Sequence, residues 1–139
     1  MTYTEWEISR GETIREDSLW KMSAYRYALY AVDMGWEDVL VLERRRVTVL
    51  LASQLYRALG SIGANLAEGY SRSSGRDRVR FYEYALGSAR EASHWYRSAE
   101  PVIGKELVAL RCDALSRIAR LLLVVIPRER QRLIRPSSG

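Results

Sequence analysis

The chain has 139 residues, of which 47% are hydrophobic, and a formal net charge of +5. This length favours one domain that can bury a core. No run approaches the roughly 20 apolar residues of a membrane span, and residues 1–17 hold four glutamates and no apolar block, unlike a signal peptide. We therefore expect a cytoplasmic protein with no membrane partner. The single cysteine, Cys112, excludes an internal disulfide.

The positive charge is concentrated in the second half of the chain. Residues 1–70 hold 8 lysines and arginines against 10 acidic residues, whereas residues 71–139 hold 14 against 7. Only Lys21 and Lys105 are lysines. A guanidinium can bind phosphate oxygens with two hydrogen bonds and can stack on bases, so an arginine-rich half favours a nucleic-acid partner. GC-rich codon usage would produce the same composition, and composition alone does not separate the two explanations.

The spacing of apolar residues predicts an all-α fold. A first helix begins at Asp17 or Ser18, has apolar residues at intervals of three and four, and ends at Gly35. A connector follows at 36–43. Three further helices are predicted at residues 44–70, 76–99 and 105–126, separated by a polar turn at 71–75 and a turn containing Pro101 and Gly104.

Four amphipathic helices with short connections can bury their apolar faces only against one another, which predicts an up-down-up-down antiparallel four-helix bundle. We expect an acidic N-terminal arm at 1–17, the bundle at 18–126 and a basic C-terminal tail at 127–139. Residues 121–126 are apolar on every side, so we expect another subunit to cover them in a homo-oligomer. The predicted interface residues are Leu121, Leu122, Val125 and Ile126.

The outer face of the third predicted helix carries a stripe of arginines. Its members follow one another at spacings of four and three, which places them along one side of the helix: Arg76, Arg80, Glu83, Gly87, Arg90, His94 and Arg97. The predicted nucleic-acid-binding set extends this stripe and consists of Arg72, Arg76, Arg78, Arg80, Arg90, Arg97, Arg117 and Arg120. The alternative is a solvated face with local pairs, such as Asp113 with Arg117. No RRM, KH or helix-turn-helix signature supports base-specific readout.

Three tyrosines near the first predicted helix are further candidates. Tyr25, Tyr27 and Tyr30 have rings that could stack on bases. Core packing is the favoured interpretation for Tyr27, because it lies on the apolar face of that helix.

An antiparallel hairpin of the second and third predicted helices could bring polar residues of the two helices near one another, as a buried polar site or as a structural clamp. Asn65 and Glu68 lie three residues apart on one, and Ser88 and Glu91 on the other. We predict that these four form a hydrogen-bonded clamp that fixes helix register, because no nucleophile or cofactor motif accompanies them. Glu91-Ala-Ser-His94 matches the Glu-x-x-His spacing of di-iron bundles, but that site needs the motif twice and the chain has one histidine. We therefore expect no metal, no cofactor and no catalytic residues.

Two stretches of the sequence resemble a known family. Residues 61–70, Ser-Ile-Gly-Ala-Asn-Leu-Ala-Glu-Gly-Tyr, and residues 81–91, Phe-Tyr-Glu-Tyr-Ala-Leu-Gly-Ser-Ala-Arg-Glu, are similar to the signature stretches of the four helix bundle protein family. This family was first seen as reading frames in intervening sequences of bacterial 23S rRNA genes, and related accessory proteins occur in diversity-generating retroelements. The resemblance extends over about residues 19–126.

The resemblance implies a small homo-oligomer, typically a pentamer with a basic face, and no enzymatic activity. In the retroelement branch it implies contacts with a reverse transcriptase and structured RNA. Two functions stay open. The first is a non-catalytic basic oligomer that binds structured RNA or DNA with little sequence specificity, beside a reverse transcriptase or an rRNA intervening sequence. The second is a protein-interaction scaffold whose basic face binds an acidic protein.

Overall fold

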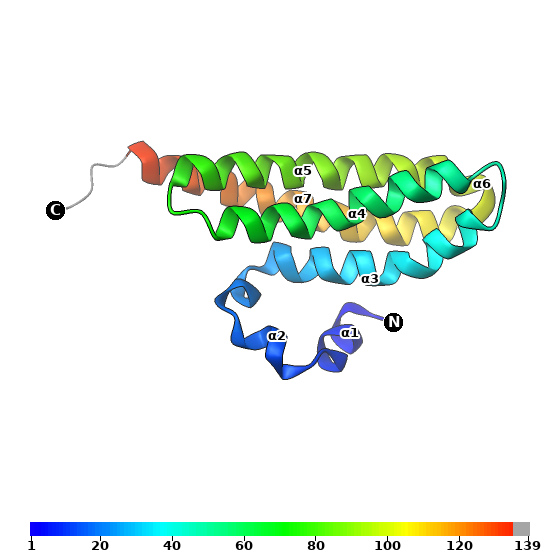
Figure 1. Ribbon diagram of the computed structural model, residues 1–139, viewed down its shortest axis with the longest axis horizontal. Coiled ribbons are helices and arrows are strands. Elements are labelled where there is room, and N and C mark those ends of the chain that lie inside the picture. The colour runs from blue at the N-terminus through cyan, green and yellow to red at the C-terminus, as the bar shows by residue number, and fades with distance from the viewer. Residues whose placement is uncertain (135–139) are drawn as a thin grey trace.

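The computed structural model describes residues 1–134, which are almost entirely helical and include no strand. Four long helices make up most of this region: α3 (Ser23–Glu43), α4 (Val49–Tyr70), α5 (Gly75–Ser98) and α7 (Lys105–Ile134). They lie side by side in Figure 1. Helices α3 and α5 each pack against both α4 and α7, so α3 and α5 are diagonally related across the core. The predicted all-α class is confirmed.

Small side chains dominate the surfaces where the long helices meet. Ala24, Ala28 and Ala31 are buried on α3, and Ala85, Ala89 and Ala92 are buried on α5. Larger aliphatic side chains from α4 and α7, including Leu55, Leu59, Leu66, Leu115, Ile118 and Leu122, fill the space between them. Because alanine projects little from the helix, the helix backbones can approach closely and exclude water from the centre.

The predicted helix end at Gly35 is wrong, because α3 continues to Glu43. Gly35 is buried, and a Cβ atom there would lie 2.5 Å from Leu59 Cδ1 and 2.9 Å from the Tyr96 hydroxyl. The glycine therefore serves a close contact inside the core instead of ending the helix. Residues 36–43, which were predicted as a connector, belong to α3 and continue its buried face, because Val39 and Leu42 are buried.

The connection between α3 and α4 is the short turn at residues 44–48. Thr48 closes it, because its Oγ1 donates a hydrogen bond to the Leu42 carbonyl at 2.6 Å. The second long helix thus begins at Val49 and not at residue 44 as predicted.

The N-terminal residues fold back along α3 as α1 (Tyr3–Ser9), α2 (Glu12–Glu16) and the 3₁₀ helix η1 (Ser18–Lys21), as Figure 1 shows. Trp6 is only 2% exposed. Its indole Nε1 donates to Asp33 Oδ2 at 2.8 Å, and Arg10 forms an ion pair with the same carboxylate. The acidic start of the chain is therefore packed against α3 by an aromatic anchor.

Helix α7 runs beyond its predicted end at Ile126 and contains Pro127. Two ion pairs tie its last turns to α5: Arg78 Nε lies 3.1 Å from Glu129 Oε2, and Arg130 donates to Glu83 Oε1 at 2.7 Å. These contacts hold the part of α7 that follows the proline against α5, and the proline itself is exposed. Part of the predicted basic tail is thus helical, and its last residues, including Arg135, lie outside the described residues.

Two of the predicted interface residues belong to the core of the chain itself. Leu122 is 0% exposed and Ile126 is 5% exposed. Leu121 and Val125 are half-buried and pack against that core. The prediction is wrong for Leu122 and Ile126, because the inward face of α7 passes through them and the chain itself covers them. Only Leu123 and Val124 remain largely exposed there.

We expect the two glycines of α4 to respond in opposite ways to alanine. At Gly69 a Cβ would lie 2.8 Å from Phe81 Cβ and 2.9 Å from Tyr82 Cε1, so Gly69→Ala should lower the free energy of unfolding by about 1–3 kcal/mol. At Gly60 no atom lies within 4 Å, so Gly60→Ala should raise it by about 0.5–1 kcal/mol. Urea denaturation measures both. Stabilisation by Gly69→Ala would contradict the close α4–α5 contact.

Candidate nucleic-acid interface

The arginine stripe lies on the outer side of α5. All seven of its members are exposed, because the opposite side of the helix packs against α4 and α7. The Ser74 side chain caps the start of α5 by accepting a hydrogen bond from the Asp77 backbone at 3.1 Å. From Arg76 to Arg97 the stripe extends over roughly 32 Å at about 1.5 Å per residue. A rigid helix therefore presents these guanidinium groups in a row.

Ion pairs divide the predicted arginines into two kinds. Arg72 pairs with Glu68, and Arg80 lies 3.5 Å from Asp77, both on exposed surface. Such exposed pairs contribute little to stability and can open for a ligand. Among the described residues, no acidic side chain lies within ion-pair distance of Arg76, Arg90 or Arg97.

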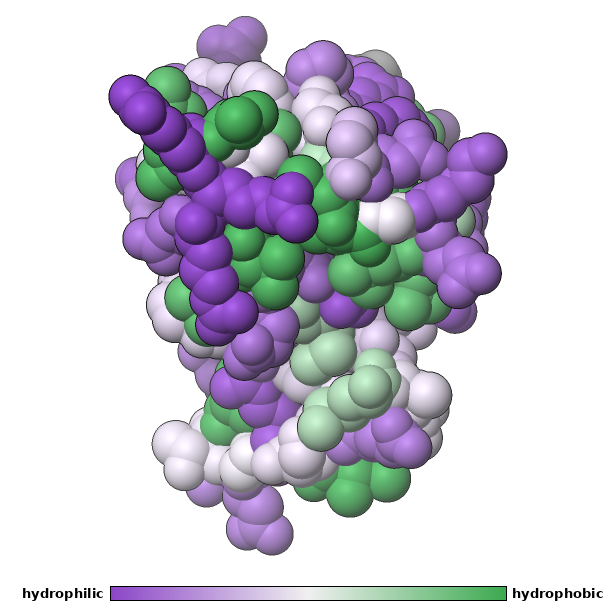
Figure 2. All heavy atoms as spheres, turned by 90° about the vertical axis from the view of Figure 1, so that its right-hand side faces the viewer, coloured by the Kyte–Doolittle hydropathy of each residue, from purple (hydrophilic) through white to green (hydrophobic). Residues whose placement is uncertain are grey.

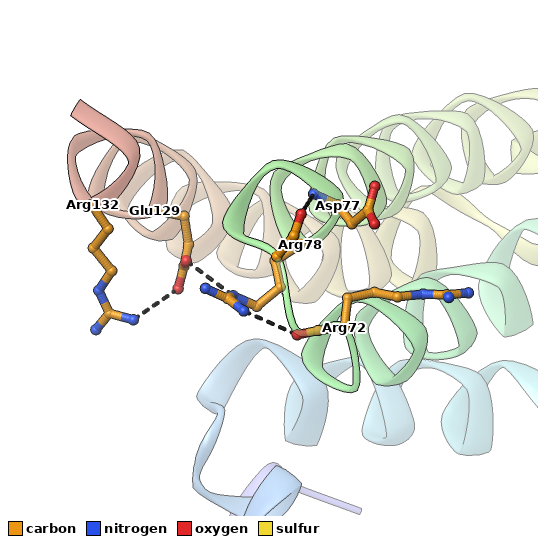
Figure 3. A network of polar contacts seen from close by, with 6 residues as sticks. Arg72, Asp77, Arg78, Glu129 and Arg132 are labelled. Atoms are coloured by element: carbon orange, nitrogen blue, oxygen red, sulfur yellow. Dashed lines mark hydrogen bonds and ion pairs between the residues drawn. The ribbon is translucent and has the colours of Figure 1, made fainter. Parts of the chain in front are cut away.

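Arg78 stabilises the fold by contacts to two other segments of the chain. Its Nη1 donates to the Arg72 carbonyl at 2.9 Å while its Nε contacts Glu129, so it joins the α4–α5 turn to α7 (Figure 3). Its side chain is 22% exposed. The sequence predicted Arg78 as a nucleic-acid contact, but the structure leaves little of its guanidinium for a ligand.

The end of α7 enlarges the basic surface. Arg130 pairs with Glu83, which is the one acidic residue of the stripe. Arg128 and Arg132 are also exposed on this end of α7, and Figure 3 shows Arg132 beside Glu129. The extension of α7 past Pro127 thus adds positive charge next to the first turns of α5, which the sequence had placed in a separate tail.

Arg117 and Arg120 lie on α7 and not on the α5 stripe. The Arg117 guanidinium lies 4.7 Å from the centre of the Tyr27 ring on α3, and Arg120 Nη1 donates to Ser116 Oγ at 3.0 Å. The predicted pair of Asp113 with Arg117 does not occur among the ion pairs of residues 1–134. Arg117 therefore borders the α3–α7 seam, whereas Arg120 reaches Ser116 at the edge between α5 and α7.

A hollow of about 240 Å³ lies between α5 and α7 beside the stripe, and it is lined in part by Arg90, Arg97 and Ser116. Cys112 also lines it. Burial raises the pKa of the Cys112 thiol, and its Sγ lies 3.9 Å from the Ser93 carbonyl. The thiol is therefore protonated at neutral pH and is a poor nucleophile.

The predicted polar clamp is only partly assembled. Asn65 Nδ2 donates to the Ser61 carbonyl at 2.9 Å, and the Ser61 and Ser88 hydroxyl oxygens lie 2.7 Å apart. Asn65 and Ser88 are thus joined through Ser61, which the sequence analysis missed. Glu68 instead pairs with Arg72, and Glu91 is exposed. Glu91 still lies at the edge of the α4–α5 contact, where it lines hollows together with Ser61 and Ser88.

A buried polar junction escaped the sequence analysis altogether. Asp38 of α3 is 4% exposed and accepts hydrogen bonds at 2.8 Å from the Tyr96 hydroxyl of α5 and from Arg111 Nε of α7. Burial raises the pKa of Tyr96 well above its ordinary value, and the charge of Asp38 adds to this shift. Burial acts to lower the pKa of Arg111 and is the largest single influence, but the hydrogen bond to Asp38, the charge of that carboxylate and the nearby tyrosines together outweigh it, so the pKa is raised. Asp38 had been assigned to a connector, so nothing in the sequence placed it inside.

The described part of the chain holds no group of three or more His, Cys, Asp or Glu side chains arranged to bind a metal ion. Within residues 1–134, none of the helices is both long enough and apolar enough to cross a membrane.

The arrangement defines a small all-α protein with an arginine-rich face. A family model described as 23S rRNA-intervening sequence protein matches residues 42–104. This range contains both stretches on which the resemblance rests, and the resemblance to this family is confirmed there.

A similar crystal structure comes from Bacteroides thetaiotaomicron and is described as a protein with unknown function from the S23 ribosomal protein family. The two chains share 22% identity with a TM-score of 0.70, over 74% of this chain and 97% of the other. At this identity the similarity shows the fold alone. No curated protein matches the sequence significantly.

We expect the buried junction to contribute strongly to stability. Asp38→Ala removes the anion that compensates Arg111, so it should lower the free energy of unfolding by about 3–5 kcal/mol. Tyr96→Phe leaves that ion pair in place and should cost about 1–2 kcal/mol. Glu68→Ala, which removes an exposed pair, is the control and should change stability by at most about 0.5–1 kcal/mol. A loss for Asp38→Ala no larger than for this control in urea denaturation would refute the role of the junction.

Proposed function

We propose that this protein is a non-catalytic, basic homo-oligomer that binds structured nucleic acid through α5 with little sequence specificity. One observation carries the proposal: Arg76, Arg90 and Arg97 are exposed along one helix face without an acidic partner among the described residues. The guanidinium fork matches phosphate oxygens, and contacts to phosphates position a protein without reading bases.

RNA is the first partner to test. The description of the matching family names 23S rRNA intervening sequences, which supports RNA ahead of DNA as the ligand. The same reasoning makes an rRNA intervening sequence, or a reverse transcriptase acting on structured RNA, the setting we propose for this chain. The non-catalytic part of the proposal rests on the available groups. Cys112 has a raised pKa, and His94 is exposed on the arginine stripe.

We further propose that the four long helices form an up-down-up-down bundle that repeats in a homo-oligomer, most simply a pentamer. The candidate contact surface is the apolar end patch, which we define as Trp36, Val47, Val49, Leu50 and Tyr56 at the α3–α4 end. Val47 is 93% exposed and Leu50 is 79% exposed. Figure 2 views this end of the molecule and shows hydrophobic groups gathered between hydrophilic ones.

The end patch has the properties of a contact site. Trp36 and Tyr56 meet edge to face at 5.4 Å between ring centres, and a hollow of about 550 Å³ lies beside them. Contiguous exposed apolar surface with a polar rim marks interaction sites in soluble proteins. Arg44, Arg45 and Arg46 are exposed in the adjoining turn and supply such a rim.

Removal of two charges from the α5 stripe should weaken RNA binding. For the double variant Arg90→Gln and Arg97→Gln we expect roughly tenfold lower affinity for a structured RNA. The log–log salt slope should also become smaller in magnitude, by about 0.7–0.9 for each phosphate that the variant no longer neutralises. Fluorescence anisotropy at several salt concentrations measures both quantities. Helicity and oligomer size should be unchanged, because both side chains are exposed.

The matched control removes two charges away from α5, through Lys21→Gln and Lys105→Gln. Both lysines are exposed, and their removal should leave the affinity within about twofold of the parent. If the Arg90 and Arg97 variant binds RNA with unchanged affinity and slope, the stripe is not the RNA-binding face. An acidic protein partner then becomes the better proposal.

A charge in the end patch should block self-association. The parent protein should show a multiple of 16.0 kDa by multi-angle light scattering, and Leu50→Glu should reduce it toward one subunit because an unpaired carboxylate would be buried at the contact. Leu123→Glu, at an exposed apolar residue of α7, is the control and should leave the mass unchanged. A monomeric parent at micromolar concentration would contradict the proposal.

A further inference from the structure

A pocket lies between the N-terminal segment, α3 and α7, away from the α5 stripe. It encloses a cavity of about 480 Å³ that opens to solvent. This volume is in the range that holds a small organic ligand, roughly 300–1,000 Å³. The residues that matter for its chemistry are Tyr27, Tyr30, Leu59, Leu115, Arg117 and Arg120.

The charged groups of the pocket favour an anion. Arg117 and Arg120 are three residues apart on α7 and therefore lie on the same side of that helix. Among the described residues, neither has an acidic side chain within ion-pair distance, and the nearby Asp113, which also lines the pocket, forms no ion pair with them. The third arginine of the pocket, Arg111, is already paired with Asp38.

Arg117 is held at the pocket before any ligand arrives, whereas Arg120 must turn from Ser116, which lines the α5–α7 hollow, to reach a ligand. Arg117 lies over the Tyr27 ring at 4.7 Å, and Arg120 donates to Ser116 Oγ at 3.0 Å. Tyr27 is itself stacked on Tyr3 at 4.1 Å between ring centres. Prior ordering of this kind lowers the entropy that binding costs.

The inner wall of the pocket is apolar. Leu59 is 1% exposed and Leu115 is 2% exposed, yet both line the cavity, so it reaches the core of the chain. Ala31, Met34, Tyr27 and Tyr30 of α3 also line the cavity. A ligand with a ring or another apolar body would cover this surface.

We propose that the pocket between α3 and α7 binds an aromatic phosphate the size of a mononucleotide. Its ring lies against the apolar wall, and its phosphate accepts hydrogen bonds from Arg117 and Arg120. A bare inorganic anion would leave the apolar wall wet, and an uncharged hydrocarbon would leave both arginines without a partner. This site differs from the proposed RNA-binding face, because Arg117 lies over Tyr27 of α3 whereas the stripe lies on α5, which is diagonal to α3.

Titration calorimetry with adenosine 5′-monophosphate tests the proposal on the full chain. We expect one ligand per chain with a Kd on the order of 10–100 μM. Adenosine and inorganic phosphate, which each supply half of the chemistry, should bind at least about tenfold more weakly. Arg117→Gln and Arg120→Gln should each weaken binding by about tenfold, because each removes a charge-assisted hydrogen bond.

Arg90→Gln on α5 is the matched control and should leave the Kd for the nucleotide unchanged. Absence of binding up to about 5 mM nucleotide would overturn the proposal, since the expected Kd lies far below that concentration. So would inorganic phosphate that binds as tightly as the nucleotide, because the apolar wall would then play no part. Saturating nucleotide should leave RNA binding unchanged, so failure here and failure of the α5 interface give different results.

Discussion

The close approach of the long helices is the constraint on which the other features of the molecule depend. Alanine and glycine occupy the contact faces, and a single added carbon at Gly35 or Gly69 would lie within 3 Å of a neighbouring side chain. A charged side chain in a core packed this tightly is costly unless a partner compensates its charge, because water is excluded there. The one buried carboxylate among the described residues, Asp38, accordingly has both Tyr96 and Arg111 as partners.

The same constraint places the basic groups. With the small residues of α5 facing inward, its long charged side chains must face solvent, so the arginine stripe is a consequence of the packing pattern. Ion pairs then select among these arginines. Arg78 holds the α4–α5 turn against α7, whereas Arg90 and Arg97 form no ion pair within residues 1–134. The useful distinction among the arginines is therefore their pairing and not their number.

The sequence predicted the features that depend on local periodicity. The all-α class and the exposed stripe on α5 follow from spacings of three and four residues, and the structure agrees with both. The sequence analysis misjudged features that depend on residues far away in the chain. Gly35 resembles a helix end, but its role is set by Leu59 and Tyr96, which come from other helices. Likewise, Leu122 and Ile126 were predicted to face another subunit, but they are buried where α7 packs against the core of its own chain.

The candidate sites show the same division. The stripe is a property of one helix, so its residues could be named from the sequence. The pocket between α3 and α7 combines Tyr27 with Arg117, which are 90 positions apart by their numbers, and no local pattern links them. The junction of Asp38 with Arg111 is of the same kind, and it also braces one wall of that pocket.

The proposed surfaces are compatible with one another because they occupy different parts of the molecule. The apolar end patch lies at the α3–α4 end, the stripe runs along α5, and the pocket opens at the seam of α3 with α7. Subunits joined through their end patches would leave the α5 stripes in solvent and repeat them around the assembly. Each copy of the stripe would add to the positive potential felt by a polyanion, so several weak phosphate contacts would combine into tight binding. Self-association and RNA binding would then reinforce each other without any contact between the two surfaces.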